Sequence, residues 1–292
     1  MEDVQGRVDG RQIAIDQAGV CDIRFPISVL DQSHRRQSTV GKLAMSVGLP
    51  HHFKGTHMSR FIEVLNEHRD EMTMRTLPAL LMHLRQRLEA VSARIEVAFP
   101  YFIERTAPAS GKSALMDYDC KFVGESQGAE DDFVLEVRVP VTTLCPCSKA
   151  VSDYGAHNQR GVIEISVRSA KIGERDERAF IWIEELVQIA EDSASAPVYP
   201  LLKRADERHV TMQAYDNPVF VEDIVRNVSS RLRQDSRVLW FKVHAVNHES
   251  IHNHSAFACL EWRRPDKVDG KPTILSSKTP RGSAQGFELK GF

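Results

Sequence analysis

The chain has 292 residues, with 38 lysine and arginine side chains against 40 aspartate and glutamate side chains, for a formal net charge of −2. This balance excludes the strong basic excess with which proteins neutralise nucleic-acid phosphates, so no nucleic-acid partner is expected. Hydrophobic residues make up 42% of the chain and charged residues 27%, a composition typical of a soluble globular protein.

The sequence gives no indication of a membrane or secretory segment. No stretch approaches the roughly 18 consecutive apolar residues of a membrane-spanning helix, and residues 1–11 contain no apolar core of a signal peptide. Five cysteines, an odd number and unevenly spaced, do not indicate a disulfide framework. We therefore expect a cytoplasmic protein with no membrane partner.

Alternating β-branched and apolar residues predict strands, and apolar residues at helical spacing predict helices. In chain order, the predicted strands are Val20–Val29, Thr39–Val47, Ala93–Arg105, Ala114–Gly124, Phe133–Val141, Gly161–Ala170, Leu239–Val246 and Ala256–Trp262. The predicted helices are Ser59–Met72, Leu77–Ala90, Ile181–Ala190 and Phe220–Leu232. Groups of antiparallel-looking strands interleaved with helix pairs indicate an α+β fold rather than a parallel βαβ sheet.

The two ends of the chain differ from its body in composition. Residues 1–15 are predicted to be a flexible N-terminus, and residues 16–264 to form the folded part. Residues 265–292 are rich in glycine, proline, serine and lysine, so we expect a tail that is mobile or ordered only against a partner chain.

The first polar cluster joins two predicted strands and contains two thiols and an imidazole, at Cys145, Cys147 and His157. Thiolate and neutral imidazole are natural ligands of a divalent transition metal. Pro146 bends the segment, so the two thiols need not point the same way. The spacing of the cysteines is not that of a zinc ribbon, and a loop with two inert thiols and a surface histidine fits the motif as well.

A second cluster, residues 201–209, places carboxylates among four cations between two predicted helices. A solvated, salt-bridged turn is the commoner structure of such a segment. Glu222 begins the next predicted helix, where the helix dipole favours any acid, so its ordinary interpretation is a helix-terminus acid.

The third cluster holds four of the chain's twelve histidines within eleven positions, together with one carboxylate: His244, His248, Glu249, His252 and His254. Core packing does not explain this density. Imidazoles that titrate near neutral pH offer metal ligation, proton transfer, or both.

Taken together, these segments resemble the type IB GTP cyclohydrolase family. The similar segments are VTTLCPCSK at 141–149, DYGAHNQR at 153–160, LLKR at 201–204, ESIHNH at 249–254 and GTHMSRF at 55–61. The resemblance runs in order from about Asp16 to Arg263, which makes it specific. It implies an α+β tunnelling fold (T-fold), with tandem units of antiparallel sheet and paired helices, assembled as an oligomeric barrel and expected to be a homotetramer.

The resemblance also implies an activity, a cofactor and a set of site residues. The implied reaction converts GTP and water to 7,8-dihydroneopterin triphosphate and formate, the entry step of folate and pterin biosynthesis, with zinc, manganese or iron as the divalent metal. The family's metal ligands fall on Cys145, His157 and Glu207, and its guanine-anchoring acid falls on Glu222. The acid and the histidines that line its pocket fall on Glu249, His252 and His254.

Two questions about these roles stay open at this stage. Either His252 or His254 would transfer the protons, since both imidazoles have a suitable reference pKa. The triphosphate requires cations, and the candidates are Arg160, Lys203 and Arg204.

Two alternative functions are consistent with parts of the pattern. Another T-fold enzyme acting on a pterin or deazapurine, such as a nitrile reductase or a tetrahydropterin synthase-like protein, would need a different arrangement of its nucleophile. A non-catalytic purine-binding or metal-storage protein would use the two thiols as a metal trap. Incubation with GTP and metal distinguishes the last case, because only turnover generates a fluorescent pterin.

Overall fold

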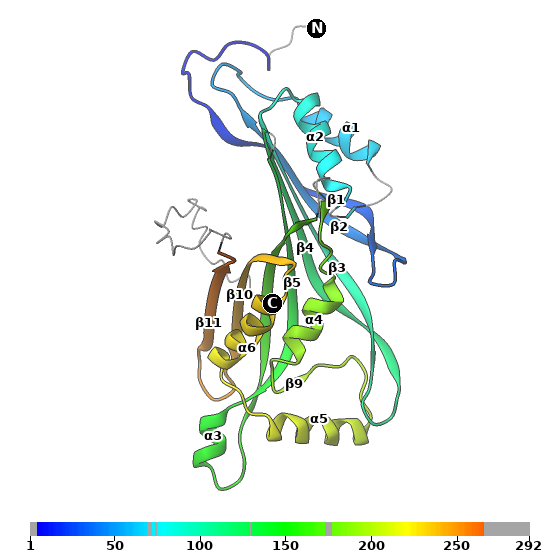
Figure 1. Ribbon diagram of the computed structural model, residues 1–292, viewed down its shortest axis with the longest axis vertical. Helices are drawn as coiled ribbons and strands as arrows, with labels where there is room; N and C mark the ends of the chain where they lie inside the picture. The colour runs from blue at the N-terminus through cyan, green and yellow to red at the C-terminus, as the bar shows by residue number, and fades with distance from the viewer. Residues whose placement is uncertain (1–4, 69–71, 74, 129, 173–176, 266–292) are drawn as a thin grey trace.

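A computed structural model describes residues 5–68, 72–73, 75–128, 130–172 and 177–265 (Figure 1). Within these residues the long strands form one sheet in the order β1-β2-β3-β4-β5-β6-β10-β11, and the short strand β9 pairs with β5. The strands are β1 (Ile15–Leu30), β2 (Arg36–Leu49), β3 (Ser92–Thr106), β4 (Ser113–Gln127), β5 (Glu130–Leu144), β6 (Asn158–Ser169), β9 (Ala196–Pro197), β10 (Val238–His248) and β11 (Ser255–Arg263). All of these pairings are antiparallel, which confirms the predicted α+β class and the predicted strands.

The described chain repeats one order of elements: two strands, then helices, then two strands. The first half has α1 (Met58–Glu67) and α2 (Leu77–Arg87) between its strand pairs. The second half has α4 (Ile183–Glu191), α5 (Arg204–Asp216) and α6 (Val221–Gln234), besides the short helix α3 (Pro146–Val151) and the two-residue strands β7 (Lys171–Ile172) and β8 (Glu177–Arg178). The halves join through the pairing of β4 with β5, from Asp119 opposite Arg138 to Gln127 opposite Glu130.

Helix α5 was not predicted, and its burial explains why. Only Asp206 and Ala214 of its thirteen residues are buried, so the segment has no apolar stripe at helical spacing. The polar segment 201–209, for which a solvated turn was the ordinary interpretation, instead leads into this helix. Helix α1 was predicted to extend to Met72, but its last helical residue is Glu67.

One face of the sheet carries the hydrophobic core and the helices. Along β2, for example, Leu43, Met45 and Val47 are buried, because alternate side chains of a strand point to the same face. The intervening side chains of neighbouring strands form a charged opposite face. There Lys121 Nζ lies 2.8 Å from Glu136 Oε2, and Arg138 lies between Asp119 and Glu164.

Helix α4 belongs to the second half of the chain but is anchored to strands of the first half. At its start, Glu184 Oε1 accepts a hydrogen bond of 2.6 Å from the hydroxyl of Tyr101 on β3. At its end, the buried carboxylate of Glu191 forms an ion pair with Arg105 of β3 and accepts a hydrogen bond of 3.1 Å from Tyr118 of β4. Two carboxylates thus hold α4 across the junction of the halves.

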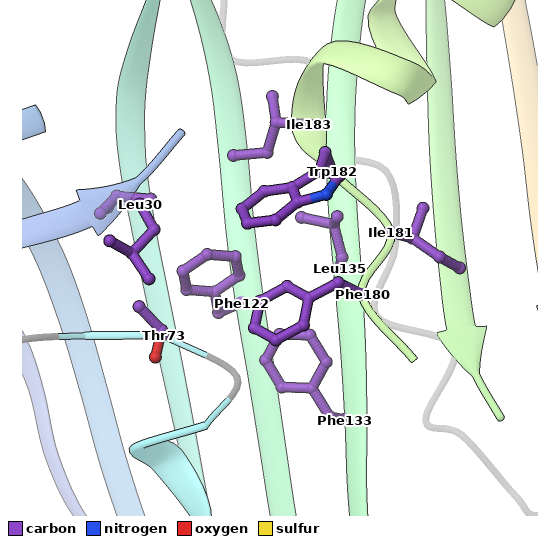
Figure 2. A pocket seen from close by; sticks show the side chains of 10 residues that line it. Leu30, Thr73, Phe122, Phe133, Leu135, Phe180, Ile181, Trp182 and Ile183 are labelled. Carbon is purple, nitrogen blue, oxygen red and sulfur yellow. The ribbon is translucent and has the colours of Figure 1, made fainter. Parts of the chain in front are cut away.

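Aromatic side chains fill the junction beside α4. Phe180 and Trp182, in the segment that leads into α4, stack with ring centroids 4.9 Å apart, and Figure 2 shows them facing Phe122 and Phe133 of the sheet. The pocket that remains between them has a volume of about 30 Å³, space for about one water molecule. The junction is therefore a packed part of the core.

The ends of the chain were predicted to be less structured than the body. Residues 1–4 and 266–292 lie outside the described residues, so the prediction for the C-terminal tail falls outside them as well. Residues 5–9 form backbone hydrogen bonds with residues 52–55. Among the helices of the described chain, none is long and apolar enough to cross a membrane.

Replacing Arg105 with alanine is expected to lower the free energy of unfolding by about 3 kcal/mol at pH 8, because it leaves the buried carboxylate of Glu191 without its counter-ion. Burial already raises the pKa of Glu191 above its ordinary value, and Arg105 opposes that rise. Without Arg105, the folded-state pKa should rise further above that of the unfolded chain. A carboxyl group of this kind takes up a proton on folding, so the lost stability should be partly regained as the pH falls toward 5.

Urea unfolding followed by circular dichroism at both pH values measures the effect. Arg138→Ala is the matched control, because this arginine forms only exposed pairs with Asp119 and Glu164 and its loss should cost less than about 1 kcal/mol. An Arg105→Ala variant with the same deficit at pH 5 and pH 8 would contradict the argument.

Candidate functional site

Three neighbouring strands bring the first and third polar clusters to one edge of the sheet. Strand β5 ends with Leu144 opposite Asn158, where β6 begins. Strand β10 ends with His248 opposite Arg160 of the same β6. Cys145 and His157, which close the β5–β6 connection, and Glu249, which follows β10, are therefore neighbours at this edge although they lie far apart in the sequence.

Hydrogen bonds fix Cys145 and His157 against each other. The backbone N–H of Cys145 donates to the carbonyl of His157 at 3.3 Å, and the N–H of His157 donates to Ser148 Oγ at 3.4 Å. The N–H of Ser148 points in turn at Cys145 Sγ, 3.5 Å away. Cys145 is the N-cap residue of α3 and is partly buried, whereas Cys147 is exposed.

The first two side chains of the loop 249–254 contact the start of β6 and His157. Glu249 Oε1 accepts a hydrogen bond of 3.0 Å from Gln159 Nε2, and Ser250 Oγ lies 2.9 Å from Nδ1 of His157. The rings of His252 and His254 stack on each other, with centroids 5.1 Å apart and an interplanar angle of 19°. Both histidines are exposed, so their imidazoles are accessible to a bound molecule.

The start of α6 lies beside the end of β5, which places Glu222 near the same edge. The N–H of Val219 donates to the carbonyl of Leu144 at 3.3 Å, one residue before Cys145. The carboxylate that caps this helix belongs to Asp223, which accepts a hydrogen bond of 3.2 Å from the N–H of Phe220. Glu222 lies in the first turn of the helix, as its ordinary interpretation expected, but it does not form the capping hydrogen bond, and it is exposed.

Helix α5 is fastened at its N-terminus by the buried side chain of Asp206. This carboxylate accepts hydrogen bonds of 2.7–2.8 Å from the N–H groups of Ala109, Ser110 and Lys203 and from the hydroxyl of Ser110. Burial alone would raise the pKa of Asp206, but these donors together outweigh burial and hold the pKa well below its ordinary value. The turn between β3 and β4 thereby determines where α5 begins.

The other end of α5 meets the loop that carries the cysteines. Lys149 of α3 donates a hydrogen bond to the carbonyl of Tyr215 and lies 4.1 Å from the centroid of its ring. Figure 1 shows α5 crossing the end of the sheet, from the β3–β4 turn to α3. Glu207 is eight residues before Tyr215, or about 12 Å along the helix axis.

One chain thus brings together part of the expected site. Cys145, His157 and Glu249 share one edge with the exposed His252 and His254, and the start of α6 places Glu222 beside that edge. Glu207, Lys203 and Arg204 are exposed around the start of α5, at the end of that helix away from α3. Among the described residues, no group of three or more histidine, cysteine or acidic side chains is placed to hold a metal ion.

Sequence reasoning missed three residues of this region: Gln159, Asp206 and Ser250. Gln159 and Ser250 lie inside the motifs that were singled out, but their partners are 90 and 93 residues away along the chain. No local pattern reveals such contacts. The sequence offers only a weak indication of the role of Asp206. It is an acid three residues after the N-cap position of α5, and that helix was not predicted.

Comparisons with known proteins show which family this chain resembles. The family model described as type I GTP cyclohydrolase folE2 matches residues 1–258. GTP cyclohydrolase FolE2 of Syntrophotalea carbinolica is 51% identical over 272 residues, which cover 93% of this chain and 98% of the relative. GTP cyclohydrolase FolE2 of Nitrosococcus oceani is 51% identical over 261 residues, which cover 89% of this chain and 95% of the relative.

A solved structure resembles the fold. Urate oxidase from Bacillus sp. TB-90 superposes with a TM-score of 0.51 at 9% identity, covering 86% of this chain and 100% of that chain. At this identity the likeness concerns the fold alone.

Cys145→Ala is expected to lower the divalent metal bound by the protein to background, whereas Cys147→Ala should retain most of it. The reason is that Cys145 is hydrogen-bonded to His157, while Cys147 is exposed on α3. Metal analysis of the dialysed proteins measures the difference, with circular dichroism to check that both variants are folded. Equal metal content in Cys145→Ala and the unmodified protein would show that this thiol is not a ligand.

Proposed function

This chain belongs to the type I GTP cyclohydrolase folE2 family, and from that membership we propose that it converts GTP and water to 7,8-dihydroneopterin triphosphate and formate. The product would enter the synthesis of folate-type pterins. The observation that carries the proposal is the edge of the sheet at which Cys145, His157 and Glu249 meet next to two exposed imidazoles. A thiol, several imidazoles and a carboxylate can hold a divalent metal and transfer protons in a metal-assisted hydrolysis.

The donor set at this edge suits a divalent transition metal. Cys145 supplies sulfur and His157 supplies an imidazole nitrogen, a pair of ligands compatible with zinc or iron and, through the imidazole and a carboxylate, with manganese. We assign Glu207 as the third ligand, supplied from α5. When bound, the metal would supply a water of lowered pKa for attack on C8 of guanine.

The protein's own side chains would handle the protons and the base. An imidazole of His252 or His254 protonates N7 of guanine and later accepts a proton as the ring opens and formate leaves. Glu249, held by Gln159, lies at the start of the same loop and orients it. The exposed carboxylate of Glu222 accepts hydrogen bonds from N1–H and the 2-amino group of guanine, donors that adenine lacks on that edge.

The triphosphate would be bound by cations around the site. Arg160 lies on β6, directly opposite His248, and Lys203 and Arg204 begin α5. Guanidinium groups bind phosphate oxygens with two parallel hydrogen bonds, which favours the two arginines for this role.

We further propose that the working enzyme is a T-fold barrel, most simply a homotetramer, with sites between chains. Within the described residues of one chain, β1 pairs only with β2 and β11 only with β10, so the outer side of each of these two edge strands has no strand beside it. Such edges invite pairing with another chain. Glu207 lies at the far end of α5 from Cys145, so a second copy of the chain would supply it.

GTP, but not ATP, should be converted to a product that becomes fluorescent after oxidation. The expected discrimination is about 10⁴-fold, because ATP would leave the Glu222 carboxylate facing the wrong edge of the base. Fluorescence after iodine oxidation measures turnover with each nucleotide. Comparable rates with ATP would refute the assignment of Glu222, and a protein that binds GTP without forming any pterin would refute the activity.

Subunit complementation tests whether one site draws ligands from two chains. Cys145→Ala and Glu207→Ala should each be inactive alone. Mixed oligomers made by co-expression should recover about a quarter of the unmodified activity, because one site in four would combine an intact Cys145 with an intact Glu207 from a different chain. No recovery in mixed oligomers, verified by two affinity tags, would place both ligands in one chain.

A further inference from the structure

A single hydrogen bond connects the imidazole of His157 to the loop that follows β10. Nδ1 of His157 and Oγ of Ser250 are 2.9 Å apart. Ser250 is not among the residues to which a role was assigned above, and it contacts a proposed metal ligand directly. Its hydroxyl therefore influences how that ligand can act.

The hydroxyl limits which nitrogen of His157 is available to a metal. A neutral imidazole carries one N–H, and its other nitrogen offers a lone pair, while a serine hydroxyl can donate or accept. If Nδ1–H donates to Ser250 Oγ, the lone pair of Nε2 is free. In the opposite arrangement the hydrogen is on Nε2, and neither nitrogen has a free lone pair.

We infer that Ser250 is a positioning residue that holds His157 as its Nδ1–H tautomer and makes Nε2 the metal-binding atom. This inference rests on the proposed function, since it concerns the metal of that site. A ligating histidine generally has its other ring nitrogen hydrogen-bonded in this way, which fixes both tautomer and ring orientation. Here the partner is a hydroxyl from a different loop.

The surroundings of the bond show why a serine at this position can orient the ring. The backbone of His157 is held on both sides, by the N–H of Cys145 and by Ser148 Oγ. Only rotation about the side-chain bonds remains, and Ser250 restrains it. The loop that presents Ser250 is itself tied to β6 by the bond between Gln159 and Glu249, the residue just before Ser250.

Cobalt(II) binding to the full-length apoprotein provides a test that does not depend on turnover. Cobalt serves as a visible probe because a thiolate ligand such as Cys145 produces a charge-transfer absorption band. Ser250→Ala is expected to weaken cobalt affinity about 10-fold, the lower end of the usual effect of losing such a partner, because water can reach this exposed site and replace part of the bond. Ser250→Thr keeps the hydroxyl and should retain the affinity.

Ser255→Ala is the matched control. Its hydroxyl lies 3.4 Å from Nδ1 of His248, so it removes a serine–histidine contact just beyond the same loop without touching a proposed ligand. Its cobalt affinity should be unchanged. As a second measurement, GTP turnover by Ser250→Ala should be restored when the metal concentration is raised at least 10-fold, which a merely structural defect would not allow.

Three outcomes would overturn the inference. Unchanged cobalt affinity in Ser250→Ala would show that the hydroxyl does not position the ligand. An equal loss in Ser255→Ala would show general loosening of the loop. If the unmodified protein neither binds cobalt nor forms a pterin, both the proposed function and this inference are refuted. If the unmodified protein turns over GTP normally and Ser250→Ala binds cobalt with unchanged affinity, only this inference is refuted.

Discussion

The register in which β5, β6 and β10 pair is the constraint on which the candidate site depends. It places Leu144 opposite Asn158 and Arg160 opposite His248, so that two loops from distant parts of the chain, 145–157 and 249–254, meet at one edge. A shift of one residue would turn every side chain of a strand to the other face. In β6 it would move Arg160 and Glu164 into the core, an energetic cost that holds the register and hence the site in place.

The anchoring of α4 also helps to hold the end of β5, just before Cys145. After the buried ion pair of Glu191 with Arg105, the chain continues into Ser195, whose hydroxyl accepts a hydrogen bond of 3.0 Å from the N–H of Leu144. The next two residues form β9 and pair with Val141 and Thr142 of β5. The residues immediately before Cys145 are therefore held on both sides, and the junction between the two halves of the chain contributes to the rigidity of the site.

Helix α5 is held mainly at its two ends. Its buried contacts are at its ends, through Asp206 and near Tyr215, while most of its side chains are exposed. Hydrogen bonds from other turns of the same chain hold its start. In the proposed assembly, its exposed side chains, Glu207 among them, would contact a second copy.

The sequence by itself determined the strands, most of the helices and the chemistry of the clusters. Period-two and helical spacing are local signals, and they predicted β1 to β6, β10 and β11 correctly, because burial of one face imposes them on neighbouring residues. The concentration of thiols and imidazoles at Cys145, His157 and the 249–254 loop was likewise visible in the sequence, and the roles assigned to these residues stay predictions.

Only the tertiary structure decided which of these groups meet. The contacts of Ser250 with His157 and of Gln159 with Glu249 join residues some ninety positions apart, and they depend on strand register rather than on any local pattern. The same holds for α5: a helix without an apolar stripe becomes stable through the caps that distant turns provide, here the N–H groups of Ala109 and Ser110 on Asp206. Local spacing records which face of an element is buried, but it carries no information about the partner that buries it.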